Sequence, residues 1–388
     1  MMLSFTALRT EATMNWFEEA DITYATFQQS YWRQRPWHGK VFLQSTLDKL
    51  SNSLSNNVLF KLAEEPLVES RVITGAPANY ELELGPFAIE ALAAGEMLMI
   101  QGLEQHLEAI SELLTSHFGF LPRWRIDDVM ASYGDTGASC GPHFDHYDVF
   151  LLQIRGEKHW QLAPGPFTDD DLLADADLRL LANFPLDSEN FTQQAGDILY
   201  IPPGIGHYGI ASNDSLTLSI GLRNPTLVEM VSSLADQITD ELTNLSTLDD
   251  RLGEPTGGLV PEDIQQLQAR LVPELTRAGT ISRWFGCYMT QLQEPDLITP
   301  NEEAYIDWST AKGSLVCQLP TRLCHQALPD SAMIFVNGAV NQADPAVVSW
   351  FAVLESNRRI DLDLIPAEPS HRILVDWLLQ EGAVALIS

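Results

Sequence analysis

Two short histidine-containing segments carry the residues of this sequence best suited to chemistry. The first reads G-P-H-F-D-H-Y-D over residues 141–148. On an extended strand His143 and Asp145 would share one face, because alternate residues point the same way. The second reads G-D-I-L-Y-I-P-P-G-I-G-H over residues 196–207, where a rigid Pro-Pro-Gly turn fixes the direction of His207. Two imidazoles and one carboxylate form the facial triad that binds Fe(II) and leaves positions open, so the spacing predicts an iron site.

The other histidines are weaker candidates for this site. His146 would lie on the opposite face of a strand from His143, and it could bind only if the strand ended there. His159 follows the next strand beside Trp160, and we expect it to be structural. The remaining histidines lie outside both motifs: His38, His106, His117, His325 and His371. The same three ligands could also take up zinc, nickel or cobalt during purification.

An iron ion with about three open positions suits a bidentate 2-oxo acid together with dioxygen. If the acid is 2-oxoglutarate, its distal carboxylate also needs a cation at a fixed distance from the metal. Arg155 and Lys158 follow the apolar run and can both serve, and each can equally be a solvated turn residue. Ser132, Tyr133 and Thr217 could add hydroxyl groups to the site.

Short strands separated by Gly/Pro turns must position these side chains. The sequence predicts strands over residues 126–133, 147–154, 198–202 and 215–222. In the last of these Thr217, Ser219 and Gly221 share one face, which we expect to point into the interior. Such strands indicate a mostly β barrel or jelly roll and not a doubly wound parallel sheet. Apolar residues at helical spacing predict one helix over residues 104–118.

An acidic insert interrupts the predicted strands over residues 168–190. We expect it to be a surface excursion whose leucines cover the barrel while its carboxylates face water. Asp148 and the carboxylates of the insert are candidate recognition groups for a basic substrate, although simple solvation also accounts for most of them.

The composition agrees with a basic partner. The chain has 388 residues, of which 45% are apolar, so it can bury a substantial core and form two or three domains. Asp and Glu number 53 against 22 Lys and Arg, which gives a formal net charge of −31. This charge repels nucleic-acid phosphates and suits a Lys- or Arg-rich protein, although an acidic surface also serves solubility alone.

No apolar run approaches the roughly 20 residues of a membrane span, and the first residues lack the basic start of a secretory signal. The cysteines are far apart and include no C-x-x-C pair, which argues against a disulfide framework or a thiolate zinc site: Cys140, Cys287, Cys317 and Cys324. We expect a soluble, cytoplasmic protein whose natural start is Met1 or Met14.

The pattern becomes helical after about residue 225. Amphipathic helices are predicted from Thr226, from Pro261 and through Trp284 to Met289, and they could form a dimer seam or pack within their own chain. Asn-Gly between two apolar runs predicts a hairpin over residues 333–340. Helices with a small hairpin fit a winged-helix-like module, which we expect to be structural because it is not basic.

Four motifs together resemble the cupin-like JmjC ribosomal oxygenases, and among them the bacterial arginine hydroxylases. The motifs are W-R-I-D-D-V-M (124–130), G-P-H-F-D-H-Y-D-V-F-L-L-Q (141–153), G-x-K-x-W (156–160) and G-D-I-L-Y-I-P-P-G-x-x-H (196–207). The segment F-Q-Q-S-Y-W-R-Q-R-P (27–36) is similar to the entry segment of that group. The resemblance covers the first 225 residues, and the later parts agree in order and general character.

The resemblance implies a double-stranded β-helix that binds Fe(II) through His143, Asp145 and His207. It places Lys158 against the distal carboxylate of 2-oxoglutarate and Ser132 beside it, with Thr217 where relatives often carry a polar amide. The bacterial arginine hydroxylases tend to have Arg in place of Lys158, whereas many JmjC relatives have Lys. It also implies a catalytic domain over 1–225, a helical dimerisation domain over 226–294 and a winged-helix-like domain over 295–388.

The function that follows is a protein hydroxylase using Fe(II), 2-oxoglutarate and O2. We expect its target to be an arginine of a large-subunit ribosomal protein, and we expect a homodimer. A JmjC oxygenase with another target, such as a histidine, is one alternative. A metal-binding cupin that serves as a scaffold without catalysis is the other, and it would have no need of a buried cation beside the metal.

Overall fold

The computed structural model describes residues 20, 22–40, 44–76, 79–174, 176–185, 188–242 and 260–387. The chain divides into two compact units, Met1–Asn224 and Pro225–Ser388. The predicted alternative starts at Met1 and Met14 lie outside the described residues. Among the residues described, no helix is both long enough and apolar enough to cross a membrane. All four cysteines are free thiols.

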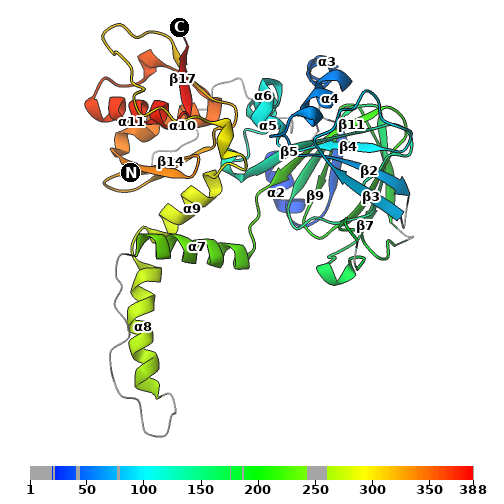
Figure 1. Ribbon diagram of the computed structural model, residues 1–388, viewed down its shortest axis with the longest axis horizontal. Helices are drawn as coiled ribbons and strands as arrows, with labels where there is room; N and C mark the ends of the chain where they lie inside the picture. The colour runs from blue at the N-terminus through cyan, green and yellow to red at the C-terminus, as the bar shows by residue number, and fades with distance from the viewer. Residues whose placement is uncertain are drawn as a thin grey trace. The chain divides into compact units, whose positions relative to one another are not determined.

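The first unit is built on two antiparallel sheets (Figure 1). The larger sheet has the strand order β1-β9-β6-β11-β5-β4-β2-β3. Its strands are β1 (Trp37–Lys40), β2 (Ser70–Ala76), β3 (Asn79–Leu84), β4 (Met97–Ile100), β5 (Ile126–Gly134), β6 (Val149–Arg155), β9 (Asp197–Ile201) and β11 (Ser215–Leu222). The smaller sheet has the order β10-β7-β8, with β7 (Glu157–Ala163), β8 (Glu189–Gln194) and β10 (Gly206–Ala211).

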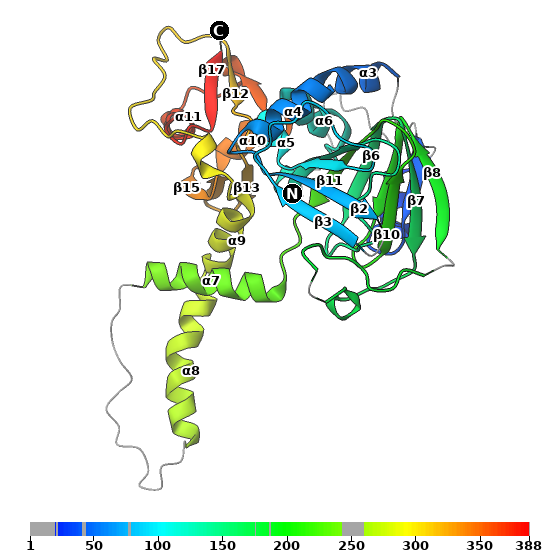
Figure 2. The same cartoon turned by 45° about the vertical axis from the view of Figure 1, so that its right-hand side comes forward.

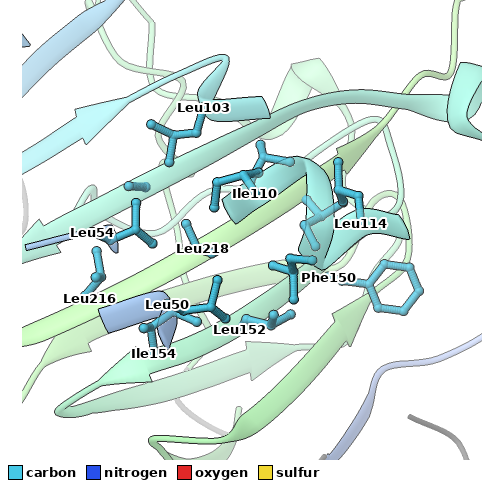
Figure 3. Close-up of a cluster of buried hydrophobic side chains, with 14 of the residues drawn as sticks. Leu50, Leu54, Leu103, Ile110, Leu114, Phe150, Leu152, Ile154, Leu216 and Leu218 are labelled. Atoms are coloured by element: carbon cyan, nitrogen blue, oxygen red, sulfur yellow. The ribbon is translucent and has the colours of Figure 1, made fainter. Parts of the chain in front are cut away.

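Alternation along β6 shows how the strands separate an outer core from the space between the sheets. Phe150, Leu152 and Ile154 belong to the large apolar core beneath the helices (Figure 3). Val149 and Leu151 instead pack with apolar residues of β7 and β9, between the two sheets. The predicted β barrel or jelly roll is therefore confirmed, and the predicted strand over 215–222 coincides with β11.

The described part of the first unit contains five helices, and α3, α4, α5 and α6 pack against strands of the large sheet or against each other (Figures 1 and 2). They are α2 (Tyr24–Ser30), α3 (Gln44–Ser53), α4 (Asn56–Glu64), α5 (Leu103–His106) and α6 (Glu108–His117). The single helix predicted over 104–118 is wrong, because Leu107 is extended and separates α5 from α6. The Glu104 side chain accepts a hydrogen bond from the Val129 N–H at 2.8 Å and so fastens α5 to β5.

Among its described residues the second unit begins with the helices α7 (Leu227–Glu241), α8 (Pro261–Thr276) and α9 (Thr280–Thr290). Thr226 and Glu229 form a capping box that begins α7, and Pro261 occupies the first turn of α8, as its sequence predicts. The rest of the stretch predicted to be helical after Thr226, beyond residue 242, lies outside the described residues.

Two small sheets complete the second unit. They are β16-β12-β17 and β13-β14-β15, joined to helices α10 and α11. The bounds are β12 (Ser314–Cys317), β13 (Leu323–Ala327), β14 (Ala332–Val336), β15 (Ala339–Ala343), α10 (Val348–Asn357), β16 (Arg359–Asp361), α11 (Pro369–Gln380) and β17 (Val384–Ile387). The predicted hairpin is confirmed: Asn337 and Gly338 connect β14 to β15 with φ of 51° and 89°, as a tight turn between strands requires.

Candidate metal and cosubstrate site

A pocket of about 360 Å³ lies between the two sheets of the first unit. Proposed metal and cosubstrate groups line it: Ser132, His143, Asp145, Lys158 and His207. They come from β5, from the loop before β6, from β7 and from β10. The jelly roll therefore brings both histidine motifs and one of the two candidate cations to a single place.

His143 and Asp145 are not on a strand, contrary to the prediction. His143 forms an isolated β-bridge with His207, and Asp145 lies in the loop that follows. The bridge consists of two hydrogen bonds, from His143 N–H to the His207 carbonyl at 3.0 Å and from His207 N–H to the His143 carbonyl at 2.8 Å. The two histidines are therefore aligned by backbone hydrogen bonds between their segments, and not by alternation along one strand.

The turn before β10 also holds the backbone of Asp145 by a hydrogen bond. Gly204 donates its N–H to the Asp145 carbonyl at 2.8 Å. Its φ of 78° is one that a residue with a Cβ rarely adopts. The Pro-Pro-Gly turn therefore holds the loop that carries Asp145 as well as directing His207.

Both imidazoles present the same nitrogen to the pocket. His143 Nδ1 lies 2.9 Å from the Gly141 carbonyl, and His207 Nδ1 lies 3.0 Å from the Ile205 carbonyl. A carbonyl can only accept, so each Nδ1 carries a proton, and Nε2 is the ring nitrogen that is left to bind a metal. This is the arrangement in which a backbone carbonyl orients a metal-binding histidine.

The three ligand groups converge closely enough for one ion. One ligand atom from each of His143, Asp145 and His207 lies within 4.8 Å of the other two, and His207 Nε2 is 3.6 Å from Asp145 Oδ2. Burial and then the neighbouring His143 lower the pKa of His207 to about 4, so its ring is neutral at physiological pH and can bind a cation. The donor set of two imidazoles and one carboxylate fits Fe(II).

Of the two cations that the sequence offered for the cosubstrate, Lys158 is the one that lines this pocket. It lies within β7, its residue is only 3% exposed, and its Nζ is 3.4 Å from Ser132 Oγ. A Cβ at Gly209 would come within 2.9 Å of Lys158 Cε, so the glycine makes room for the lysine stem. Burial lowers the pKa of the Lys158 ammonium, as expected for a charge with little hydrogen bonding in an enclosed space.

Arg155 and Tyr133 point away from the pocket. Arg155 pairs with Asp214 at 3.0 Å, donates to Asn56 at 2.6 Å and lies over the Tyr133 ring at 5.4 Å. Tyr133 also packs against the helix-covered core. Lys158 and Ser132 are therefore the groups that line the pocket, whereas Arg155 and Tyr133 do not.

Only part of the polar face of β11 (Thr217, Ser219 and Gly221) reaches the pocket. Ser219 and Gly221 line the pocket. Thr217 is fully buried, is paired in register with Ser132 and donates its hydroxyl to Gln153 at 2.9 Å. Thr217 is thus one step removed from the pocket lining.

Asp148 is not a surface recognition group, contrary to one expectation. It is fully buried, accepts a hydrogen bond from the Tyr200 hydroxyl at 2.5 Å and lies 3.3 Å from Arg33. Burial raises the pKa of this carboxyl, against the hydrogen bond from Tyr200 and the charge of Arg33. Asp148 therefore ties the entry segment to β9.

The acidic insert does more than cover the barrel. Its Asp177 and Arg179 line the pocket, and Leu181 donates its N–H to the Pro142 carbonyl at 2.8 Å. His146 lies 3.0 Å from Asp169 of the insert, which removes it from the metal site. The expected surface excursion, with buried leucines and exposed carboxylates, therefore also forms one wall of the pocket.

The other histidines have partners or places elsewhere. His38 lies near Asp197, and His117 contacts Ser116. In the second unit His325 contacts Glu355, and His371 accepts a hydrogen bond from Trp350. His106 ends α5, and His159 lies in β7.

Sequence reasoning missed several pocket residues. They are Arg71 on β2, Gln101 after β4, Asp128 on β5 and Tyr147, which lies in the same loop as Asp145. Cys140 also lines the pocket, with its Sγ 3.9 Å from His143 Nδ1. The sequence did carry a signal for Arg71 and Gln101, because each lies at one end of a short apolar run, in S-R-V-I-T-G and in M-L-M-I-Q.

Comparison with known proteins agrees with this geometry. Residues 113–230 match the family model described as JmjC domain, and residues 275–383 match that described as ROXA-like winged helix. These matches confirm the predicted jelly roll followed by a winged-helix-like module.

Curated relatives and solved structures point the same way. The ribosomal protein uL16 3-hydroxylase of Escherichia coli (strain K12) is 27% identical over 308 residues, which cover 76% of each chain. A probable ribosomal oxygenase of Haemophilus influenzae is 28% identical over 275 residues, covering 68% of this chain and 67% of the relative. The ribosomal oxygenase YcfD of Escherichia coli, solved with cobalt and 2-oxoglutarate, has a TM-score of 0.77 at 25% identity, covering 95% of this chain and 99% of that one.

Proposed function

We propose that this chain, a JmjC-domain protein homologous to the ribosomal oxygenases, hydroxylates an arginine side chain of a large-subunit ribosomal protein. It is a 2-oxoglutarate-dependent hydroxylase that uses Fe(II) and O2. The observation that carries the proposal is the convergence of His143, Asp145 and His207 in one pocket with the buried Lys158.

Each group of the pocket has one task in this proposal. His143, Asp145 and His207 would hold the iron, while Lys158 and Ser132 would hold the distal carboxylate of 2-oxoglutarate. Iron bound there would activate O2, of which one atom would be inserted into an unactivated C–H bond and the other would enter succinate as 2-oxoglutarate is converted to succinate and CO2. The chain itself positions the target carbon and excludes water.

A carboxylate on the pocket wall supports a guanidinium as the target group. Asp128 and Tyr147 both line the pocket, opposite the backbone of Gly221. A Cβ at Gly221 would lie 3.0 Å from Asp128 Oδ1 and 3.5 Å from the Tyr147 ring. Asp128 thus gives this wall a carboxylate with which a guanidinium could pair, and the net charge of −31 favours the approach of a basic protein.

The uL16 3-hydroxylase relative supports the ribosomal substrate. A second target residue has support of its own, since the bifunctional lysine-specific demethylase and histidyl-hydroxylase NO66 of Brugia malayi is 37% identical over 110 residues. The scaffold alternative has no use for a buried lysine facing the metal ligands, so Lys158 argues against it.

Intact-mass measurement of the organism's own ribosomal proteins tests the function. We expect one large-subunit protein to be lighter by one oxygen atom in cells that lack the gene, and fragmentation to place that oxygen on an arginine. Oxygen on a histidine would establish the second target. No change in any ribosomal protein would overturn the ribosomal substrate.

The oligomeric state, the roles of the domains and the location follow from the same proposal. We infer a homodimer through the helical region, because apolar residues of α7 and α8 are exposed, among them Leu227, Val231, Leu271 and Val272. The parts 1–225, 226–294 and 295–388 would then serve catalysis, dimerisation and structural support, with no direct role in nucleic-acid binding. A ribosomal substrate supports a cytoplasmic location.

A further inference from the structure

A buried hydroxyl lies in the loop that carries two of the proposed metal ligands. Ser139 is in the segment between β5 and β6, shortly before His143, and it is only 2% exposed. The residues that line the pocket do not include Ser139, and the proposed chemistry does not use it. A buried hydroxyl needs hydrogen-bond partners, so the partners of Ser139 indicate its role.

The loop runs along β10, an end strand of the small sheet, and backbone hydrogen bonds hold it there at two places. At the first place the Gly137 N–H donates to the Ala211 carbonyl at 2.8 Å, and the Ala211 N–H donates to the Ala138 carbonyl at 3.0 Å. The second place is the bridge between His143 and His207. Ser139 lies between these two places.

The Ser139 hydroxyl connects the loop to β10 between the two backbone contacts. It donates to the Gly209 carbonyl of β10 at 2.7 Å, and it accepts from the Gly141 N–H at 3.0 Å. An N–H can only donate and a carbonyl can only accept, so the one hydroxyl satisfies both groups and its hydrogen points to Gly209. A side chain without a hydroxyl could bond to neither.

Gly141 links this hydroxyl to a proposed metal ligand. Its N–H is bonded to Ser139, and its carbonyl lies 2.9 Å from His143 Nδ1. Its φ of 82° favours glycine, and a Cβ there would come within 2.5 Å of Leu180 and 2.8 Å of Tyr80. Gly141 is therefore confined by packing as well as by Ser139, and its carbonyl is held where the His143 ring can donate to it.

Gly209 links the same hydroxyl to the cosubstrate group. A Cβ at Gly209 would come within 2.9 Å of Lys158 Cε, so the stem of the lysine passes close to the Gly209 backbone. Ser139 thus connects the residue that orients His143 with the strand that leaves room for Lys158.

We propose that Ser139 is a positioning residue that holds the Gly141 carbonyl against His143 Nδ1 and so orients the His143 ring for the metal. This inference rests on the proposed role of His143 as a metal ligand and is independent of the substrate. A group that orients a metal-binding histidine affects the affinity for the metal although it does not touch the ion. Loss of the hydroxyl should therefore weaken metal binding and leave the fold intact.

The test measures the binding of Co(II) to the metal-free full chain. In Ser139→Ala, whose side chain is smaller than the native one, the Kd of Co(II) should rise about three- to tenfold, the scale of a lost hydrogen bond between neutral groups. Ser139→Thr and Ser139→Val place side chains of the same shape there, and only Thr keeps a hydroxyl. The Thr variant should bind Co(II) more tightly than the Val variant. The visible absorption of bound Co(II) should also differ between them, because a turned imidazole changes the coordination geometry.

A matched control separates positioning from a general loosening of the loop. Thr136, in the same loop, donates its hydroxyl to the Ser212 carbonyl directly after β10 at 3.2 Å. Thr136→Ala therefore removes another bond between a loop hydroxyl and the backbone, and it should leave the Kd of Co(II) unchanged. Circular dichroism of the metal-free proteins should show the same fold in every variant compared.

Four outcomes would overturn the inference. An unchanged Kd in Ser139→Ala, or equal Kd values in Ser139→Thr and Ser139→Val, would refute it while leaving the metal site intact. A loss in Thr136→Ala as large as that in Ser139→Ala would show that the loop as a whole, and not the Ser139 hydroxyl, sets the affinity. Undiminished Co(II) binding in His143→Ala would remove the metal role of His143 and with it the role of Ser139.

Discussion

His143 and His207 are hydrogen-bonded to each other through their backbones in both directions, at 3.0 and 2.8 Å. This bridge holds the two imidazole rings with their centroids 4.2 Å apart. The loop before β6 and the start of β10 are thus joined at the metal site by main-chain bonds that no side-chain substitution removes. Because the bridge is made by the backbone, the ligand side chains can be exchanged without dismantling the fold.

Substitution of the ligands should therefore remove the metal and spare the structure. In His143→Ala and Asp145→Ala we expect iron binding and 2-oxoglutarate turnover to fall to background, because two ligands rarely retain the ion. Metal content by elemental analysis and circular dichroism of the same samples make the measurement. His146→Ala is the control, since His146 contacts Asp169 in place of the metal ligands. Turnover that survives in either ligand variant would refute the assignment.

Lys158 should control the affinity for 2-oxoglutarate and not for iron. Lys158→Ala removes the buried cation of the pocket, and we expect the KM for 2-oxoglutarate to rise about ten- to a hundredfold with iron content unchanged. Arg155→Ala should leave this KM unchanged, because Arg155 is engaged by Asp214 and Asn56 outside the pocket. A raised KM in Arg155→Ala together with an unchanged KM in Lys158→Ala would show that Arg155, and not Lys158, binds the distal carboxylate.

The lowered pKa of Lys158 predicts a dependence on pH. The ammonium form binds the carboxylate, so affinity for 2-oxoglutarate should weaken as pH rises through the Lys158 pKa, which burial sets below the usual value for lysine. Lys158→Arg stays charged throughout and should bind with little dependence on pH. Titration of 2-oxoglutarate into metal-loaded, oxygen-free protein between about pH 7 and 10 compares the two. Parallel curves for both proteins would contradict the prediction.

The same burial predicts a cost in stability. Without cosubstrate, Lys158→Met should raise the free energy of unfolding by about 1–3 kcal/mol, because a buried charge with one distant hydrogen-bond partner is replaced by an apolar chain. The unfolded wild type binds the proton more tightly than the folded state, so wild-type stability should rise with pH between the lowered pKa and about 10.4. Lys158→Met should lack that rise. Urea unfolding at several pH values checks both points, and a less stable Lys158→Met would contradict the first.

The sequence predicted what depends on local pattern. Alternation of apolar and polar residues located β11, and the Asn-Gly pair located the hairpin of β14 and β15. The ligands His143, Asp145 and His207 could be proposed from residue type and spacing, although the argument assumed a strand where the structure has a bridge and a loop.

What the sequence could not predict depends on pairing between distant segments. Asp148 looked like a surface carboxylate, and its burial follows from Tyr200 and Arg33, which come from other parts of the chain. Arg71 and Gln101 reach the pocket because β4 and β2 follow β5 in the sheet, an order that differs from the order along the chain. Such neighbours cannot be derived from periodicity.

The helix α8 provides the last prediction. None of its described side chains is buried, yet it carries apolar residues at helical spacing: Ile264, Leu267, Leu271, Val272 and Leu275. A 16-residue helix with a solvated apolar face is marginal by itself, so we expect a second copy of the chain to cover it. Leu271→Glu would place a charge on that face and should halve the mass measured by analytical ultracentrifugation. Leu364→Glu, at another exposed leucine of the second unit, should leave the mass unchanged. A monomeric wild type, or a Leu271→Glu variant that stays dimeric, would show that α8 is not the dimer contact.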